Sequence, residues 1–490
     1  MESLNRIMLT NVFHVLPELL WCCFGVALML LQPFVKSRQA LTFIALVGAA
    51  AGTLVTFYTQ MGGGFSGLIQ LDTFSLFFHW LVGLVAFLVI LGSDSYLQRE
   101  QLEGAEFYAL ILFATAGMGV LSSAQELLTA FIGLEMSSIS SYVLAGYRRD
   151  SIKASESAMK YFLLGSFATA FFLYGIALVY GVTGSTNLTA LANANTNGTL
   201  LRLGLTLILV GLGFKVAAAP FQIWTPDVYE GAPTPVTALF SAGPKAATFA
   251  LLLRIFGTVR AATDFWFWAF WILAVLTMFV GNLGALVQNN VKRMLAYSSI
   301  AHAGYTLVAF AAVTFVRPDP EAVAPAYAAV LFYVASYALV SVGSFTVVSE
   351  IGGTGERYLT YDDYAGLGTR QPFAAAALTL FLLSLLGLPI TAGFFGKLYI
   401  FSAAIKSHLV WLAVWMAVNS VIGAYYYFRL IVVMYMREYK GPASTEMSKG
   451  LSPTAAMVVT VAALITLYLG LAPNHILGIV LSQPLMMSAR

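Results

Sequence analysis

Apolar residues run through this chain in uninterrupted stretches of about 20, too long for the alternation of a half-buried strand and not confined to one helical face. Such stretches are typical of helices that cross a lipid bilayer. They predict about fourteen spans, near 16–35, 41–61, 73–93, 106–124, 126–146, 157–182, 200–222, 234–257, 266–288, 293–315, 324–349, 372–404, 410–436 and 454–482. The pattern therefore predicts an all-α integral membrane protein.

Composition supports this interpretation. The chain has 490 residues, of which 59% are hydrophobic and 10% charged, with a mean hydropathy of +0.83. A soluble domain carries roughly 25% charged residues, so a soluble fold is excluded. The net charge of +3 gives no reason to expect a nucleic-acid partner. The two cysteines, Cys22 and Cys23, cannot supply the four thiolates of an iron–sulfur cluster.

The basic residues predict the orientation, because cytoplasmic loops accumulate Lys and Arg. Fifteen of them fall in or next to the odd-numbered loops, against seven in the even-numbered loops and the tails. We expect a multi-pass protein of the bacterial inner (plasma) membrane with both termini on the periplasmic side. No cleavable signal segment is expected, since a basic stretch before the first span is missing.

Proline interrupts two spans at membrane depth, at Pro220 and Pro389. A broken helix is tolerated in lipid only where the freed backbone faces protein or water. The two broken spans are five apart in order, so they cross in opposite directions, as in an inverted repeat. We therefore expect an N-terminal three-helix segment over 1–105, a first repeat of spans four to eight over 106–257, a second inverted repeat of spans nine to thirteen over 266–436, and a C-terminal helix over 454–490.

Ionisable residues inside the predicted spans are the candidate chemistry, because each is costly in lipid and needs an interior function. Glu135 lies mid-span with Ser138 and Tyr142 on its helical face, at i+3 and i+7. Lys215 and Lys397 flank the two helix breaks, and Lys245 lies at the centre of the eighth span. Burial disfavours the charged form of a lysine, so such groups can lose and regain a proton near neutral pH. The alternative is that each lysine is one half of a structural ion pair.

His302 lies in the tenth span with Ser298, Tyr305 and Thr306 on its face. The near-neutral titration of imidazole suits a proton relay, although a packed, hydrogen-bonded histidine is the alternative. The repeat places His302 roughly where Glu135 stands in the first half. Together these residues predict a polar axis from Glu135 through Lys215, Lys245 and His302 to Lys397. Glu18 and His79 are assigned no role.

Four motifs carry a resemblance to a known family: A-M-K-Y-F-L-L-G-S-F (158–167), F-Q-I-W-T-P-D-V-Y-E-G-A-P-T-P-V-T-A (221–238), V-K-R-M-L-A-Y-S-S-I-A-H-A-G-Y (291–305) and P-I-T-A-G-F-F-G-K (389–397). They resemble the antiporter-like subunits of respiratory complex I over nearly the whole chain. The chain is most similar to the subunit N type, since a sibling subunit has glutamate at the position of Lys397 and the largest sibling has a further span and a lateral helix.

The resemblance implies a fourteen-helix fold with two inverted five-helix repeats and proton translocation driven by quinone reduction elsewhere in a complex. It implies that Glu135 pairs with Lys215, that Lys245 connects the halves and that Lys397 ends the second half. No cofactor is expected on this chain, whereas quinone, FMN and iron–sulfur clusters are expected in partner subunits, and neighbouring antiporter-like subunits are the expected partners. The alternatives are a subunit of a multi-subunit Na⁺/H⁺ antiporter of the same fold and a membrane scaffold with merely structural charges.

Overall fold

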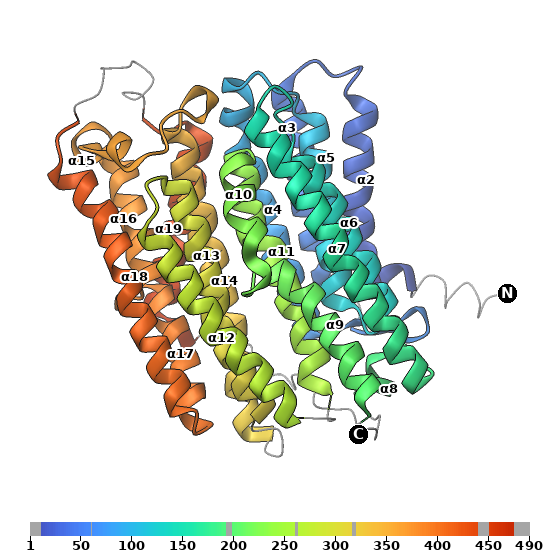
Figure 1. The fold of residues 1–490 in the computed structure, drawn as a ribbon. Coiled ribbons are helices and arrows are strands. Elements are labelled where there is room, and N and C mark those ends of the chain that lie inside the picture. The colour runs from blue at the N-terminus through green and yellow to red at the C-terminus, as the bar shows by residue number, and fades with distance from the viewer. Residues whose placement is uncertain are drawn as a thin grey trace.

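A computed structural model describes residues 11–59, 61–192, 198–259, 263–315, 320–439 and 450–474. Long helices dominate these residues and run side by side along one direction (Figure 1). The helices are α2 (Leu16–Leu31), α3 (Arg38–Leu54), α4 (Thr73–Arg99), α5 (Ala105–Ser123), α6 (Leu127–Ala145), α7 (Ile152–Thr183), α8 (Leu188–Ala192), α9 (Thr199–Val216), α10 (Trp224–Gly231), α11 (Thr234–Thr258), α12 (Thr263–Leu286), α13 (Val291–Phe315), α14 (Pro320–Ile351), α15 (Leu367–Arg370), α16 (Pro372–Leu386), α17 (Ala392–Lys406), α18 (Val410–Met436) and α19 (Pro453–Leu471).

Short elements occupy the connections. Two three-residue strands, β1 (Gly62–Gly64) and β2 (Ile69–Leu71), pair antiparallel between α3 and α4. The 3₁₀ turns are η1 (Val55–Phe57), η2 (Phe65–Gly67), η3 (Phe221–Ile223), η4 (Thr354–Glu356) and η5 (Tyr361–Tyr364). All five ionisable candidate residues therefore lie on helices.

Among the described residues, twelve helices are long and apolar enough to cross a membrane, with α9 and α10 counted as one span. Shorter apolar helices stand where the other two spans were predicted: α2 has 16 residues, and α16 and α17 have 15 residues each. The all-α membrane fold is thus confirmed, and the long span predicted over 372–404 is two helices. The end of the last predicted span, beyond residue 474, lies outside the described residues.

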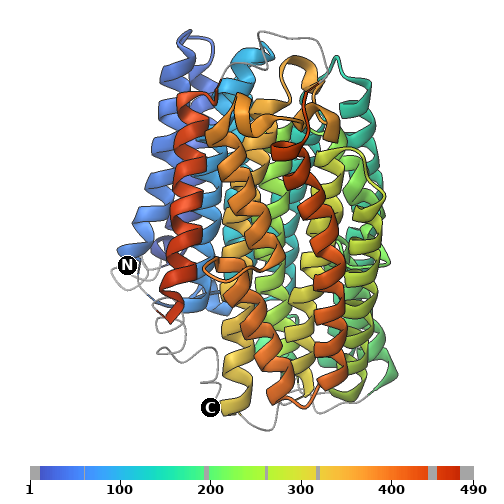
Figure 2. The same ribbon diagram turned by 90° about the vertical axis from the view of Figure 1, so that its left-hand side faces the viewer.

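Three helices form the centre of the bundle. Every residue in the apolar window of α11 is buried, as are 94% of those in α13 and in α14, whereas the windows of α7, α12 and α18 are at most 39% buried. The last three therefore present their outer faces to lipid or to neighbouring chains. Figure 2 shows α19 beside the N-terminal helices, in agreement with its packing against α4 and α14.

Glycines allow the closest helix contacts. A Cβ added at Gly117 of α5 would lie 2.5 Å from the backbone nitrogen of Ser137 on α6, and one added at Gly175 of α7 would lie 2.6 Å from the carbonyl oxygen of Gly204 on α9. Small residues that bring backbones together are the usual basis of helix packing in membranes, where apolar burial drives association weakly.

The two predicted breaks occur, and both are built the same way. Helix α9 is capped by Ala217, which follows its last residue, has a φ of 63° and stands three residues before Pro220. Helix α16 is capped by Gly387, which follows its last residue, has a φ of 89° and stands two residues before Pro389. At both ends the next residue donates its N–H back to a carbonyl in the last turn, the Schellman arrangement, at 2.8 and 3.0 Å. Figure 2 shows the second break part-way along the bundle.

A second local arrangement also recurs. The residue before α6, Glu126, forms a β-bridge with Asn187, which follows α7. The residue before α13, Asn290, forms one with Thr360, which follows α14. The recurrence of both arrangements supports the predicted five-helix repeats, whose detailed correspondence stays a prediction.

Counting along α6 and α13 from these two bridges refines one expectation. If the two bridges are equivalent, this count pairs Glu135 with Ser299 and His302 with Ser138, one helical turn further along. His302 therefore lies near the position equivalent to Glu135, displaced by that one turn.

Candidate functional site

The five predicted residues lie on five different spans that pack together. Glu135 is on α6, Lys215 on α9, Lys245 on α11, His302 on α13 and Lys397 on α17. Lys215, Lys245 and His302 are buried, with 6%, 3% and 4% of their surface exposed, and the other two are half-buried. Helix packing thus shelters three of these groups from lipid and bulk water.

Lys215 occupies the last turn of α9, next to the first break. Its Nζ donates to the hydroxyl of Tyr142 at 3.3 Å and lies 5.0 and 5.1 Å from the ring centres of Tyr142 and Tyr161. Aromatic faces attract a cation without fixing its proton. Across the break, the indole N–H of Trp224 donates to the carbonyl oxygen of Phe214 at 2.9 Å, which holds α10 against the end of α9.

Glu135 is not in direct contact with Lys215. Among the described residues no carboxylate oxygen lies within 4.0 Å of the Lys215 Nζ. The Oε1 atom of Glu135 is buried without a hydrogen-bond partner in the part of the chain that is described. The expected Glu135–Lys215 pairing stays a prediction, and in this conformation Tyr142 takes the lysine contact.

Lys245 is bound by a single residue of the neighbouring central helix. Its Nζ donates to the carbonyl oxygen of Ser299 at 3.2 Å and to the hydroxyl of the same serine. A small internal cavity of about 10 Å³ lies between Lys245, Ser299, His302 and Tyr337. That is close to the least space that holds one water molecule.

His302 has a tyrosine hydroxyl on each ring nitrogen. Nδ1 lies 2.6 Å from the hydroxyl of Tyr333 and Nε2 lies 3.2 Å from that of Tyr427, while the ring of Tyr337 stacks on the imidazole at 5.0 Å. A hydroxyl can donate or accept, so both tautomers of the neutral imidazole are accommodated. The surroundings therefore do not force the proton onto one nitrogen.

Lys397 lies at the second break, and its ammonium reaches back across it. Nζ donates to the carbonyl oxygen of Leu386 and to the hydroxyl of Ser420, both at 2.9 Å, and lies 4.7 Å from the ring centre of Tyr305. Leu386 is the last residue of α16, so the charge sits at the negative end of that half-helix.

Asn282 connects Lys397 to His302. Its amide donates to the hydroxyl of Tyr305 at 3.1 Å and accepts from the hydroxyl of Tyr426 at 2.9 Å. The Tyr426 ring lies 4.4 Å from that of Tyr427, which contacts the imidazole. Polar groups thus continue from Lys245 through His302 to Lys397.

Aromatic side chains fill the space between Lys215 and Lys245. The ring of Tyr161 stacks on Trp224 at 4.5 Å, and Trp224 lies 6.1 Å from Tyr229, whose ring centre is 5.8 Å from the Lys245 Nζ. The connection between the two halves is therefore made by ring faces, in contrast to the hydroxyls and amides of the second half.

Sequence reasoning named these five ionisable residues as candidates but did not name most of their contacts. Of the expected neighbours, Tyr142 contacts Lys215 and Tyr305 lies over Lys397. The contacts it missed come from other helices: Ser299, Asn282, Tyr333, Ser420 and Tyr427. Their only signal in the sequence is a hydroxyl or amide side chain within an apolar span.

Other basic residues are paired with acids at one end of the bundle. The buried Lys292 Nζ lies 2.8 Å from Glu356, and Arg293 bridges Asp227 at 2.8 Å and Glu230 at 2.9 Å. These five residues tie α13 to α10 and to η4. Lys215, Lys245 and Lys397 differ from them, since their hydrogen-bond partners among the described residues are neutral.

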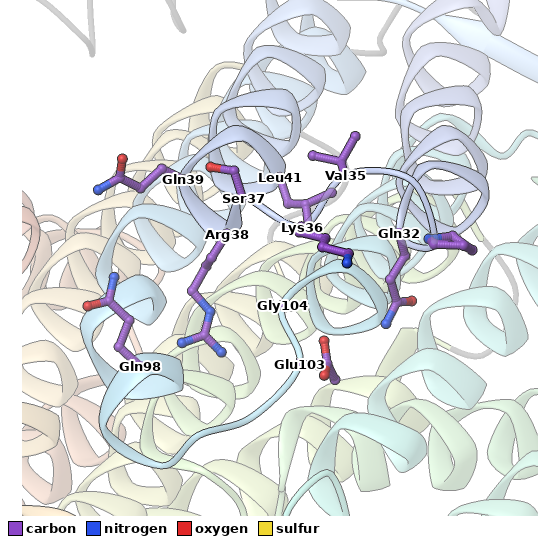
Figure 3. Close-up of a pocket in the computed structure, with 11 residues that line it drawn as sticks. Gln32, Val35, Lys36, Ser37, Arg38, Gln39, Leu41, Gln98, Glu103 and Gly104 are labelled. Carbon is purple, nitrogen blue, oxygen red and sulfur yellow. The ribbon is translucent and has the colours of Figure 1, made fainter.

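A surface cleft lies apart from the five residues. It measures about 890 Å³ and opens between the α2–α3 and α4–α5 connections, where Lys36, Arg38 and Glu103 line it (Figure 3). None of the five candidate residues lines this cleft. Among the described residues no three His, Cys, Asp or Glu side chains converge as a metal site.

The sequence of this chain matches a known family of membrane proteins. The family model described as NADH:quinone oxidoreductase/Mrp antiporter, transmembrane region, matches residues 124–423, the part that contains all five axis residues. The chain belongs to this family. A member named NADH-quinone oxidoreductase subunit N 1, from Solibacter usitatus, is 48% identical, with 95% of this chain and 96% of that protein covered. The predicted resemblance to antiporter-like subunits is thus confirmed.

Solved structures of the family share the fold. A chain of respiratory complex I from Thermus thermophilus superposes with a TM-score of 0.78 at 37% identity, covering 94% of this chain and 98% of that one. A chain of the Mrp complex from Dietzia superposes with a TM-score of 0.81 at 21% identity, covering 97% and 96%. The second likeness concerns the fold alone. The chain described here is therefore a multi-pass membrane protein of this family.

Proposed function

We propose that this chain is the subunit N-type, proton-translocating membrane subunit of an NADH:quinone oxidoreductase. Its protons move through Glu135, Lys215, Lys245, His302 and Lys397. The observation that carries the proposal is that three lysines at membrane depth have only neutral hydrogen-bond partners among the described residues. A buried ammonium without a carboxylate gains little from staying charged, because desolvation disfavours it.

The contacts suggest how the residues act. Each lysine holds a proton against oxygen atoms or ring faces, which stabilise the charge without neutralising it. His302 exchanges the proton it carries with either tyrosine hydroxyl, so a proton can enter at one nitrogen and leave from the other. The small cavity beside Lys245 is placed to hold the water that joins Ser299 to the imidazole.

In the first half, movement of Glu135 toward or away from Lys215 would load and release a proton. An opposite charge within about 4–6 Å favours the ammonium, and its withdrawal favours the neutral amine. The half-buried position of Glu135 fits such a movement, because its neighbours one turn away, Ile132 and Ile139, are exposed. The energy for this movement would come from quinone reduction in partner subunits.

Replacing Lys215 with Ala tests the proposal. The variant is assembled in the complete complex and reconstituted in liposomes, where quinone reduction and acidification are measured together. We expect most proton pumping to be lost while the assembly stays intact. Lys153→Ala is the matched control, since Lys153 is 73% exposed and pairs with Glu230 at the end of the bundle. Normal pumping in the Lys215 variant would refute the assigned role.

A second candidate is a subunit of a multi-subunit Na⁺/H⁺ antiporter, since a chain of the Mrp complex has the same fold. The 48% identity to a subunit N favours complex I. Pumping by the purified complex that requires Na⁺ would favour the antiporter. A purely structural role for the charges predicts normal coupling after mutation of Glu135 or Lys397.

The remaining assignments follow from the same proposal. Neighbouring antiporter-like subunits are the proposed partners, and FMN, iron–sulfur clusters and quinone are assigned to other subunits. Both termini are proposed to face the periplasm. Protease accessibility of tags at either end, in oriented membrane vesicles, tests this topology, and cleavage only from the cytoplasmic side would overturn it.

A further inference from the structure

Two titratable side chains meet in the N-terminal helices, away from the proposed axis. Glu18 of α2 and His79 of α4 are 5% and 0% exposed, and Oε1 of the glutamate lies 2.7 Å from Nε2 of the histidine. Neither residue has a role in the mechanism above. Buried ionisable groups at membrane depth are costly, so a pair of them requires an explanation.

The hydrogen bonds of His79 fix the number of protons in the pair. Nδ1 lies 2.6 Å from the carbonyl oxygen of Ser75, which can only accept, so Nδ1 carries a hydrogen. The contact between Nε2 and the Glu18 oxygen then needs a second hydrogen, because two lone pairs would repel at 2.7 Å. This proton belongs either to an imidazolium or to a carboxylic acid, and in both cases the pair is neutral overall.

The structure gives the Glu18 carboxyl group few hydrogen-bond donors. Its Oε2 atom is buried and has no hydrogen-bond partner among the described residues. On α5 the facing residue is Gly119, where an added Cβ would lie 3.0 Å from Oε1. The ring of Trp21 stacks on the imidazole at 6.1 Å and closes the site on the other side. A permanently ionised carboxylate would normally be given more donors than this.

The charged groups nearby are already paired. Arg254 of α11 lies close enough to act on His79, but its guanidinium donates to Asp72 at 2.7 Å and to the carbonyl oxygen of Ser122 at 2.7 Å. Because the charges of Arg254 and Asp72 are opposite and adjacent, their combined electrostatic effect on His79 is small. On α2, the titratable neighbours of Glu18 are Cys22, one turn after it, and His14, one turn before it.

The pair lies near one end of the bundle. Glu18 is in the first turn of α2, and His79 lies about 9 Å along α4 from its first residue, at 1.5 Å per residue. Asp72, the N-cap of α4, has 26% of its side chain exposed and marks the nearer end of the bundle. This is the end proposed to face the periplasm.

We propose that Glu18 and His79 form a second proton-binding site, separate from the five-residue axis and in exchange with the aqueous phase at that end. The site takes one proton from hydronium, which is shared between Oε1 and Nε2, and returns it to water. Releasing the proton leaves a carboxylate beside a neutral imidazole. The contact between them must then lengthen, so occupancy by the proton is coupled to the packing of α2 against α4.

Infrared difference spectra of the purified complex, recorded between acidic and alkaline buffer, test the site directly. The variants are Glu18→Gln, His79→Gln and the double variant, in which two amides can still hydrogen-bond and fill the space. Glu126→Gln is the control, since this buried carboxylate caps α6 through Thr129 and lies outside the pair. Quinone reduction is measured on each preparation to establish that the complex is intact.

We expect one carboxyl signal of the native complex to disappear completely in Glu18→Gln and in the double variant, to move along the pH axis in His79→Gln, and to persist in the control. A spectrum of Glu18→Gln identical to the native one would overturn the proposal and leave a static pair. If only the double variant assembles, its spectrum alone decides in the same way. If none does, Glu18→Asp keeps the carboxyl, and an unchanged signal in that variant would also overturn the proposal. The outcome is independent of the Lys215 experiment, because no axis residue is altered.

Discussion

The buried pair of Lys292 and Glu356 makes a sharp prediction about stability. The ammonium is fully buried, the carboxylate is 7% exposed, and their atoms lie 2.8 Å apart. The second carboxylate oxygen accepts the N–H and the hydroxyl of Thr234, both at 2.7 Å, and Lys292 also donates to the carbonyl oxygen of Ala232. The pair therefore joins the start of α13 to η4 and to the start of α11.

We expect Lys292→Met to destabilise the protein by about 3–5 kcal/mol, the usual cost of leaving one buried charge without its partner. The two hydrogen bonds from Thr234 remain and favour the lower part of that range. A loss of about 3 kcal/mol still changes an equilibrium more than a hundredfold. The double variant Lys292→Met with Glu356→Gln should recover most of the loss, because no unpaired charge remains.

The assay is unfolding of the assembled complex in mild detergent as a function of pH. Burial raises the pKa of Glu356, but the Lys292 ammonium and the Thr234 donors outweigh it, so the pKa lies below its ordinary value. The stability from this carboxylate is therefore complete above about pH 4.3, the unfolded value, and is lost as the pH falls through the folded value. A single variant that loses less than about 1 kcal/mol, or a double variant no better than the single one, would refute this reasoning.

Two further predictions concern the axis. Ser299→Ala removes the hydroxyl that binds Lys245, and since a hydrogen bond to a charged group contributes about 1.5–3 kcal/mol, pumping should slow roughly tenfold or more at unchanged quinone reduction; an unchanged rate would contradict the contact. Gly387→Ala should destabilise the protein by about 1–2 kcal/mol, because the residue has a left-handed φ of 89°. It should also displace Lys397, whose Cδ would lie 3.0 Å from the new Cβ, so lower thermal stability and slower pumping are expected. The control Gly181→Ala should change neither, because no atom lies within 4 Å of the added Cβ.

The fold could be predicted because lipid leaves few choices. Hydrophobic stretches located the spans, and Pro220 and Pro389 located both breaks to within three residues. The span over 372–404 was predicted to be interrupted at Pro389, and it consists of two helices, α16 and α17. The left-handed residue that ends α9 is Ala217, which carries no sequence signal of the kind glycine gives.

The site was only half predictable, for a physical reason. An ionisable residue in an apolar span is visible in the sequence because lipid makes it costly, which is how Lys245 and His302 were found. Its partners are ordinary serines and tyrosines, and Ser299 and Tyr427 acquire their roles only when α13 and α18 pack against neighbouring helices. The same holds for Glu18 and His79, which are 61 residues apart in the chain and meet only through the packing of α2 against α4.

The ammonium of Lys397 rests on the carbonyl of Leu386 and the hydroxyl of Ser420. Both are oxygens that accept a hydrogen bond but are far too weakly basic to take the proton itself. A carboxylate in either place would compete for that proton and hold the charge permanently. In the proposed mechanism, the break in α16 would thus let Lys397 store a proton beside oxygens that cannot take it, so release would require another acceptor. Such an arrangement would limit proton leak across the membrane, because in the resting state no neighbouring group could accept the proton from Lys397.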